Sequence, residues 1–194
     1  MKELDFRNKS CPIPLVETRK FINSNRNEDF KIILDNEVAF LNIKKFLENN
    51  KLNYSSNKSS NLYTFEVIFD GNEKLPEEKF QINNFSIFVM GDKFGNGVEE
   101  LSKILMKSYF YALNESITLP SNIIFINSGV KLLKKSSGVL ASLESLRRKG
   151  VSILACGMCV DYYNLKDEVS SIAEITNMYS IIEILNNSDN VIRI

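Results

Sequence analysis

The stretch Ser10-Cys11-Pro12-Ile13-Pro14 combines a thiol with two prolines that flank a single residue. Proline is favoured in the first turn of a helix, where backbone donors have no partner within the helix. We therefore predict a helix over residues 12–25 with Cys11 at its N-cap. There the N–H of Ile13 and the positive end of the helix dipole would face the sulfur and favour the reactive thiolate. A cysteine that merely precedes a helix is the alternative.

Strand and helix patterns alternate on both sides of this stretch. The expected strands are residues 3–6, 30–34, 52–56 and 62–69, and a second helix is expected over residues 38–50. The polar residues 57–61 are expected to form a hairpin loop between the last two strands. The order βαβαββ predicts a two-layer α/β sandwich.

A polar stretch with a glycine and a proline follows, and it predicts a linker. The expected organisation is a first domain over residues 1–69, a linker over 70–84 and a second domain over 85–194. In the second domain the expected strands are residues 85–90, 123–126, 151–155 and 191–194, and the expected helices are 98–113, 139–149, 160–168 and 179–185. Apolar strands that alternate with helices predict an open, mainly parallel α/β sheet with helices on both faces.

Polar and thiol side chains follow three of these strands. They are Gly91-Asp92, Asn127-Ser128-Gly129 and Cys156-Gly157-Met158-Cys159. Ligands of open parallel sheets bind outside the carboxyl ends of the strands, so we expect these groups to converge on one crevice. The glycines of residues 91–97 are not in the phase of a dinucleotide fingerprint and lack the Lys-Ser/Thr of a P-loop. We expect them to serve a strand-to-helix turn.

The pair Cys156-x-x-Cys159 has several interpretations. Zinc and iron–sulfur sites need about four ligands, whereas the chain has three cysteines and no histidine, so we predict no metal and no cofactor. Three interpretations stay open: a thioredoxin-like disulfide pair, a thiol that accepts sulfur or selenium beside a resolving thiol, and two buried cysteines in a β–α turn. The lack of histidine also excludes serine-triad and Cys-His catalysis of the common kinds.

The composition limits the partners and the cellular compartment that we expect for this protein. Lys and Arg number 24, as do Asp and Glu, and no basic patch stands out, so no nucleic-acid partner is expected. The basic run over residues 131–135 is interpreted as solvated surface. No apolar run approaches the length of a membrane span, and the N-terminus lacks the apolar region of a signal peptide. Three cysteines, an odd number, do not form a secreted disulfide framework, which predicts a reducing cytoplasm.

The first domain resembles the TusA/SirA-like sulfur-carrier domains. The residues that carry this resemblance are Leu4, Asp5, Cys11, Pro12, Ile13 and Pro14. It covers about residues 1–69, and the chain has Asn8 where the family usually has glycine. The resemblance implies that Cys11 is the persulfide or perselenide site, with Asp5, Pro12 and Pro14 in support.

The second domain resembles the DsrE-like domain of the YedF selenium-metabolism proteins, whose domain order it shares. The matching stretches are residues 105–113, 124–132, 156–167 and 176–179. The family usually has threonine where this chain has Met158. The resemblance implies that Cys156 and Cys159 are the thiols of this domain, and Asp92, Asn127, Ser128 and Gly129 are the groups expected beside them.

Together the two resemblances imply a sulfurtransferase-like carrier of sulfur or selenium, with persulfide or perselenide donor and acceptor proteins as partners. A relay from Cys11 to Cys156 or Cys159 is compatible with a linker of about 15 residues, which spans up to roughly 50 Å when extended. Two other functions stay open: a CxxC thiol–disulfide oxidoreductase and a non-enzymatic binding or regulatory module. Whether the protein is an enzyme and whether it forms a homo-oligomer are also open.

Overall fold

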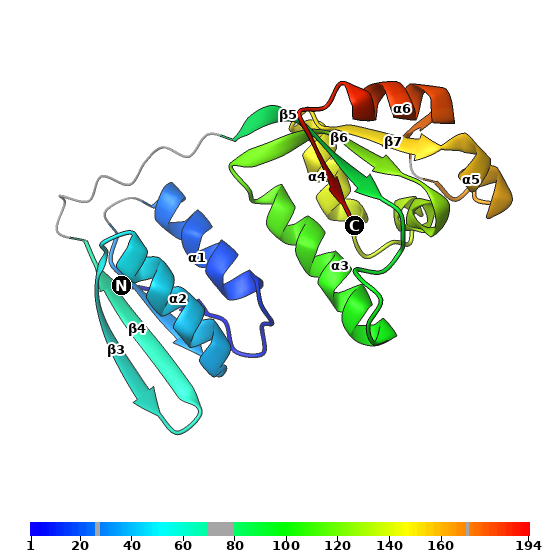
Figure 1. Ribbon diagram of the computed structural model, residues 1–194. Helices are drawn as coiled ribbons and strands as arrows, with labels where there is room; N and C mark the ends of the chain where they lie inside the picture. The colour runs from blue at the N-terminus through cyan, green and yellow to red at the C-terminus, as the bar shows by residue number, and fades with distance from the viewer. Residues whose placement is uncertain (26–27, 70–79, 170) are drawn as a thin grey trace. The chain divides into compact units, whose positions relative to one another are not determined.

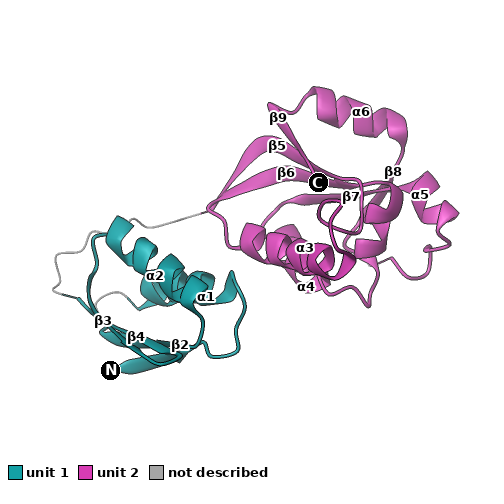
Figure 2. Ribbon diagram, turned by 60° about the horizontal axis from the view of Figure 1, so that its bottom comes forward, with its two compact units in different colours: residues 1–78 teal, residues 79–194 magenta. Residues whose placement is uncertain are grey.

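The chain divides into two units that share no hydrophobic core among the described residues. The computed structural model describes residues 1–25, 28–69, 80–169 and 171–194, and the chain separates into the units Met1–Glu78 and Lys79–Ile194 (Figure 2). Most of the predicted linker, residues 70–79, lies outside the described residues.

The first unit is a two-layer sandwich. Its elements are β1 (Lys2–Asp5), α1 (Ile13–Ser24), β2 (Phe30–Leu34), α2 (Glu37–Asn49), β3 (Asn53–Ser59) and β4 (Leu62–Ile68). The sheet has the order β1-β2-β4-β3, with β1 parallel to β2 and the other pairs antiparallel. Both helices cover one face of this sheet (Figure 1). Phe30, Ile32 and Leu34 alternate along β2 and are fully buried beneath the helices, which confirms the predicted βαβαββ fold.

The hairpin between β3 and β4 is tighter than predicted. Ladder pairing continues to Ser59 opposite Leu62, so Ser60 and Asn61 alone make the turn. Ser60 has a φ of 53°, the left-handed conformation that short hairpin turns require. The polar residues of β3 read as loop in the sequence because most of this strand is exposed.

The second unit is built on a parallel sheet. Its elements are β5 (Gln81–Val89), α3 (Glu99–Asn114), β6 (Thr118–Phe125), the 3₁₀ helix η1 (Asn127–Leu133), α4 (Leu140–Arg148), β7 (Ser152–Cys156), α5 (Gly157–Tyr162), β8 (Glu174–Thr176), α6 (Met178–Asn186) and β9 (Asn190–Arg193). The strand order is β8-β7-β6-β5-β9, and every pair is parallel. This confirms the predicted open α/β sheet.

Helices cover both faces of this sheet (Figure 1). Helices α3 and α4 pack on one face through a large core that includes Met106, Phe110 and Leu143. Helix α6 covers the other face, where Ile181 packs against a smaller core that includes Leu154. Strands buried from both sides explain the continuous apolar runs of the sequence.

Several boundaries differ from the sequence predictions. Strand β5 begins at Gln81, inside the predicted linker, and its polar first half is exposed. The helix expected over residues 160–168 instead occupies Gly157–Tyr162, which places Cys159 within it. The elements η1 and β8 were not predicted, because one is a single 3₁₀ stretch and the other has three residues.

Candidate thiol sites

The Cys11 thiol lies exposed in the turn before α1. Pro12, not Cys11, occupies the N-cap, and no side chain caps the helix. The N–H of Ile13 donates to the carbonyl oxygen of Ser10 at 3.1 Å, so it does not face the sulfur. The predicted N-cap position of Cys11 is therefore wrong: the carbonyl of Pro12 accepts the first helical hydrogen bond, from Val16 at 3.1 Å, and the thiol lies one residue outside the helix.

Asn42 is the side chain that approaches this sulfur. Its Nδ2 lies 3.9 Å from Sγ of Cys11, and it reaches the thiol from α2. Asn42 was missed in the sequence because it lies 31 residues from Cys11 and belongs to no motif. An amide donor beside the sulfur stabilises negative charge there.

The loop that carries Cys11 is held by two carboxylates. Asp5 binds Arg7, whose Nη2 lies 2.5 Å from Oδ2, and the hydrogen bonds from Arg7 lower the pKa of Asp5 to about 2. Asn8 has a φ of 60°, and its N–H donates to Oδ2 of Asp35 at 2.9 Å. Asparagine is one of the few residues other than glycine that adopt this left-handed backbone readily. Asp5 thus supports the loop through Arg7.

The two prolines of the motif, Pro12 and Pro14, lie at the start of α1. Pro14 is buried in the first turn of α1, while Pro12 is half-buried beside the thiol. Both lack the N–H that a first helical turn leaves without a partner. The two prolines therefore define where the helix starts and where the thiol stands.

In the second unit, the ends of β5, β6 and β7 lie at one edge of the sheet. The N–H of Asp92 donates to Oγ of Ser128 at 3.2 Å, and the Ser128 hydroxyl donates to Oδ1 of Asp92 at 3.2 Å. The N–H of Asn127 donates to Sγ of Cys159 at 3.1 Å. The structure thus brings the polar groups of all three strand ends together.

The two thiols of the second unit differ in access. Cys156 ends β7 and is 3% exposed, packed against Ile124, Leu154 and Ile181. Cys159 lies on α5 and is half-buried, and the two thiols are free. Burial raises the pKa of Cys159, and its contact with Cys156 adds to this, while the Asn127 N–H acts in the opposite direction. Cys159 is therefore the thiol that a reagent meets first in this unit.

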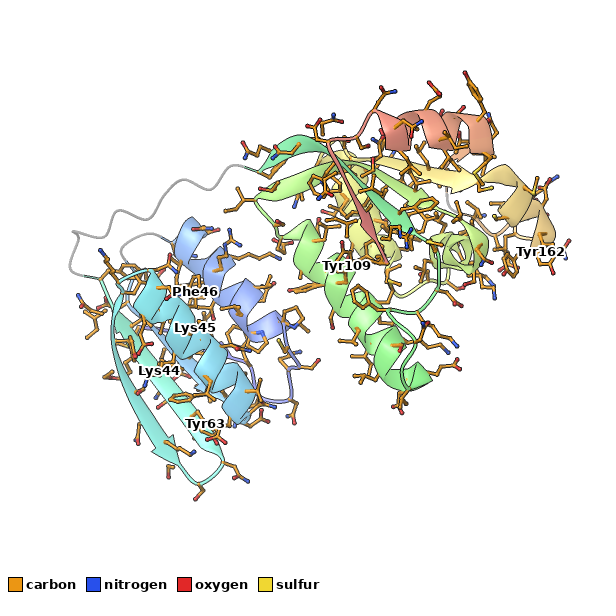
Figure 3. The ribbon with its side chains drawn as sticks, viewed as in Figure 1. Lys44, Lys45, Phe46, Tyr63, Tyr109 and Tyr162 are labelled. Carbon is orange, nitrogen blue, oxygen red and sulfur yellow. The ribbon has the colours of Figure 1, made fainter. Side chains whose placement is uncertain are left out.

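A polar network extends from Cys159 through Asn127. The hydroxyl of Tyr163 donates to Oδ1 of Asn127 at 3.0 Å, and the Lys131 ammonium lies over the Tyr163 ring, 4.5 Å from its centroid. Lys131 is half-buried, whereas Lys135 at the end of the same basic run is exposed, as expected of solvated surface. The neighbouring Tyr162 stands at the outer end of α5, 79% exposed (Figure 3).

Gly129 has a packing role. A Cβ atom at this position would lie 2.5 Å from the carbonyl oxygen of Val89, so only glycine lets η1 approach β5 this closely. Close approach here keeps Asn127 and Ser128 at the strand ends.

Two classes of feature are not found among the residues that the structure describes. No three His, Cys, Asp or Glu side chains in residues 1–25, 28–69, 80–169 and 171–194 are grouped so that they could hold a metal ion. None of the helices in those ranges has the length and apolar character needed to cross a membrane.

Comparison with protein families now identifies both units. Residues 2–68 match the family model described as sulfurtransferase TusA, and residues 83–194 match that of the DsrE/DsrF-like family. The chain belongs to the DsrE/DsrF-like family and carries a TusA domain before it. A Methanocaldococcus jannaschii protein named "Putative sulfur carrier protein" is 39% identical over 51 residues, which are 26% of this chain and 68% of that protein.

Three solved structures are similar at low sequence identity. A SirA-like protein from Desulfitobacterium hafniense matches 35% of this chain and 96% of its own, at 18% identity and a TM-score of 0.33. The ychN protein from E. coli matches 58% and 99%, at 14% identity and a TM-score of 0.43. A conserved protein of unknown function from Bacteroides thetaiotaomicron matches 56% and 94%, at 16% identity and a TM-score of 0.41.

The three thiols are predicted to differ in reactivity. With iodoacetamide at neutral pH, Cys11 of the TusA unit reacts first because it is exposed, and Cys159 reacts slowly because it is half-buried and its raised pKa keeps it protonated. The labelling rate at Cys159 should keep rising with pH beyond the pH at which ordinary thiols are fully ionised, because its pKa is raised. Cys156 reacts only after unfolding. Peptide mass spectrometry over time measures all three, and labelling of Cys156 ahead of Cys159 in the native protein would contradict this order.

Substitution of Gly129 is predicted to destabilise the DsrE unit. Gly129→Ala places a methyl group against the backbone oxygen of Val89 and should lower the free energy of unfolding by about 1–3 kcal/mol. Gly97→Ala is the matched control, because its Cβ would meet only Ser102 Oγ at 3.9 Å. Urea unfolding followed by circular dichroism measures both, and equal midpoints for the two variants would refute the close contact.

Proposed function

We propose that this protein carries sulfur as a persulfide on Cys11. The Cys11 thiolate attacks the outer sulfur of a donor persulfide, R–S–SH; the donor S–S bond breaks, Cys11–S–SH forms and R–S⁻ leaves. The step involves no net oxidation or reduction, so it needs no oxidant. The observation that supports it best is the exposed thiol of Cys11 at the start of α1, in the unit that matches the sulfurtransferase TusA model.

Asn42 is proposed as a positioning residue for this step. Its Nδ2 is 3.9 Å from Sγ, so its amide N–H is in place to stabilise charge on the thiolate and then on the persulfide. Neutral hydrogen bonds contribute modestly, so this residue tunes the rate and does not decide whether loading occurs.

The DsrE unit is proposed to receive the atom on Cys159 and to release it with the help of Cys156. If Cys159 carries a persulfide, the Cys156 thiolate attacks its inner sulfur, the Cys156–Cys159 disulfide forms and HS⁻ leaves. An external dithiol then reduces the disulfide. The contact between the two thiols and the greater access of Cys159 support this order of roles.

The cargo is proposed to include selenium. A donor of the type R–S–SeH delivers selenium to Cys11 by the same displacement, giving Cys11–S–SeH and R–S⁻. The partners are accordingly donor and acceptor proteins that present a persulfide, a perselenide or a free thiol. A thiol–disulfide oxidoreductase centred on Cys156 and Cys159 is the second candidate, favoured by the contact between those thiols.

Loading of Cys11 is the decisive prediction. Incubation of the reduced protein with glutathione persulfide should add the mass of one sulfur atom to the Cys11 peptide, and with glutathione selenopersulfide the mass of one selenium atom. Cys11→Ser should abolish this adduct and leave the circular dichroism spectrum unchanged, because the thiol is exposed. A protein with no adduct on any cysteine, but whose Cys156 and Cys159 dithiol reduces insulin, is oxidised to the Cys156–Cys159 disulfide and is restored by an external dithiol in turnover, would be an oxidoreductase instead.

Removal of the Asn42 amide should slow loading without preventing it. Asn42→Ala is expected to lower the rate of persulfide formation on Cys11 by about two- to tenfold, the effect of one neutral hydrogen bond. Asn49→Ala, an exposed asparagine on the same helix, is the matched control and should load at the wild-type rate. Stopped-flow mixing with mass analysis measures the rates. Identical rates for the two variants would show that Asn42 has no role in the loading of Cys11.

A further inference from the structure

A pocket of about 220 Å³ lies beside the strand ends of the DsrE unit, on the α3 side of Asp92. Three lysines line it: Lys103 and Lys107, one turn apart on α3, and Lys131 on η1. Its apolar lining includes Met106 and Val139, which are buried. The pocket therefore combines a cationic rim, in which Lys103 and Lys107 are exposed and Lys131 is half-buried, with a buried apolar wall.

Positive charge in this pocket is only partly compensated. Lys103 binds Glu99 at 2.8 Å, but neither Lys107 nor Lys131 forms an ion pair with any residue that the structure describes. Asp92 is the one carboxylate of the lining, against three ammonium groups. An anion that enters gains two lysines with no competing carboxylate partner.

The size of the pocket limits the ligand. Pockets for drug-sized molecules measure about 300–1,000 Å³, so this one is smaller than those and has room for a small oxyanion. A nucleotide phosphate at the glycine loop over residues 91–97 is disfavoured for a second reason. Glu99 and Glu100 fill the first turn of α3 and satisfy the positive end of its dipole.

One hydroxyl group and one carboxylate group determine which anion the pocket can bind. Ser137 Oγ accepts the N–H of Val139 at 3.3 Å, which leaves its O–H free to donate to an oxyanion. Asp92 uses Oδ1 to accept from Ser128, which leaves Oδ2 as an acceptor that can bind only a proton-bearing partner. Hydrogen phosphate keeps a P–O–H group near neutral pH, whereas sulfate has no proton to donate and would meet the Asp92 charge.

We propose that this pocket binds inorganic hydrogen phosphate, with its oxygens on Lys107, Lys131 and Ser137 and its P–O–H group donating to Asp92. The site is independent of the persulfide chemistry of Cys11. A phosphate monoester at neutral pH is largely deprotonated and lacks the donor, so the free ion is favoured over a phosphorylated side chain.

Isothermal titration of the full chain with inorganic phosphate tests the site, with sulfate and phosphoserine as the other arms. We expect saturable phosphate binding that is at least about tenfold tighter than binding of sulfate or phosphoserine. Phosphate gains a hydrogen bond to the Asp92 carboxylate, whereas the other two anions lack the proton and are repelled by it. Binding of sulfate as tight as that of phosphate, or the absence of saturable phosphate binding, would overturn the proposal. Tighter binding of phosphoserine would assign the pocket to a phosphorylated partner and equally overturn it.

Substitutions in the pocket lining test how much Lys107 contributes to phosphate binding. Lys107→Met should weaken phosphate binding about tenfold, whereas Lys45→Met, at an exposed lysine on α2 of the other unit (Figure 3), should leave it unchanged. Gly138→Ala provides a change without loss of charge, because a Cβ there would lie 2.6 Å from Cε of Lys107 and displace that side chain. It should weaken binding several-fold. Unchanged binding in both pocket variants would refute the role of Lys107.

The Asp92→Asn variant tests the discrimination. It should bring the affinities for phosphate and sulfate to within about twofold of each other, because the carboxamide no longer repels a fully ionised anion. A ratio that stays at the wild-type value would show that Asp92 does not contact the ligand. The Cys11→Ser variant should bind phosphate like the wild type, so failure of the persulfide proposal and failure of this one give different results.

Discussion

Parallel pairing of β6 with β5 on one side and with β7 on the other determines where the chemistry of the second unit can occur. The register Val89↔Phe125↔Ala155 ends all three strands at one edge, and the chain leaves each of them through polar or thiol residues. The hydrogen bonds between Asp92 and Ser128, and from Asn127 to Cys159, then tie these exits together. Gly129 makes this possible, because a side chain there would push η1 off the sheet.

The two units present thiols of opposite character. Cys11 is exposed on a loop within reach of the Asn42 amide, which is compatible with the exchange with other proteins that we propose. Cys159 is half-buried, its pKa is raised by burial, and it has Cys156 beneath it. Such a thiol is slow toward adventitious oxidants, because the thiolate is the reactive form. The first unit therefore has an exposed thiol, whereas the second has a half-buried thiol that packs against a buried one.

The sequence predicted the architecture well because both folds depend on burial patterns that are local in the chain. Strand β2 was predicted to the residue because Phe30, Ile32 and Leu34 alternate, and the long helices were predicted to within one or two residues at either end. The N-cap of α1 was wrong because Pro12 can supply the first helical carbonyl itself. Strand β8 was missed because three residues with an edge position show no periodicity.

The same limit applies to the sites. Motif and strand-end reasoning predicted Cys11, Cys159, Asp92 and Asn127 as site residues, and the structure places the last three at one edge of the sheet. Asn42 and Tyr163 act through contacts that span 31 and 36 residues, and a single sequence carries no record of such pairs.

Lys131 joins the two features of the DsrE unit that sequence alone could not connect. Its ammonium lies over Tyr163, whose hydroxyl binds Asn127, and the Asn127 N–H binds Cys159. The same ammonium lines the pocket beside Asp92. An anion drawn to that pocket competes with the aromatic ring for one cation, and a ring contact of this kind at a partly exposed site is worth only about 0.5–1 kcal/mol. A charge-assisted hydrogen bond to an anion exceeds that value, so the lysine would follow the anion, while Tyr163 keeps its hydrogen bond to Asn127 and its edge contact with Tyr162. Anion binding in the pocket and the cation–π contact with Tyr163 thus draw on the same ammonium group.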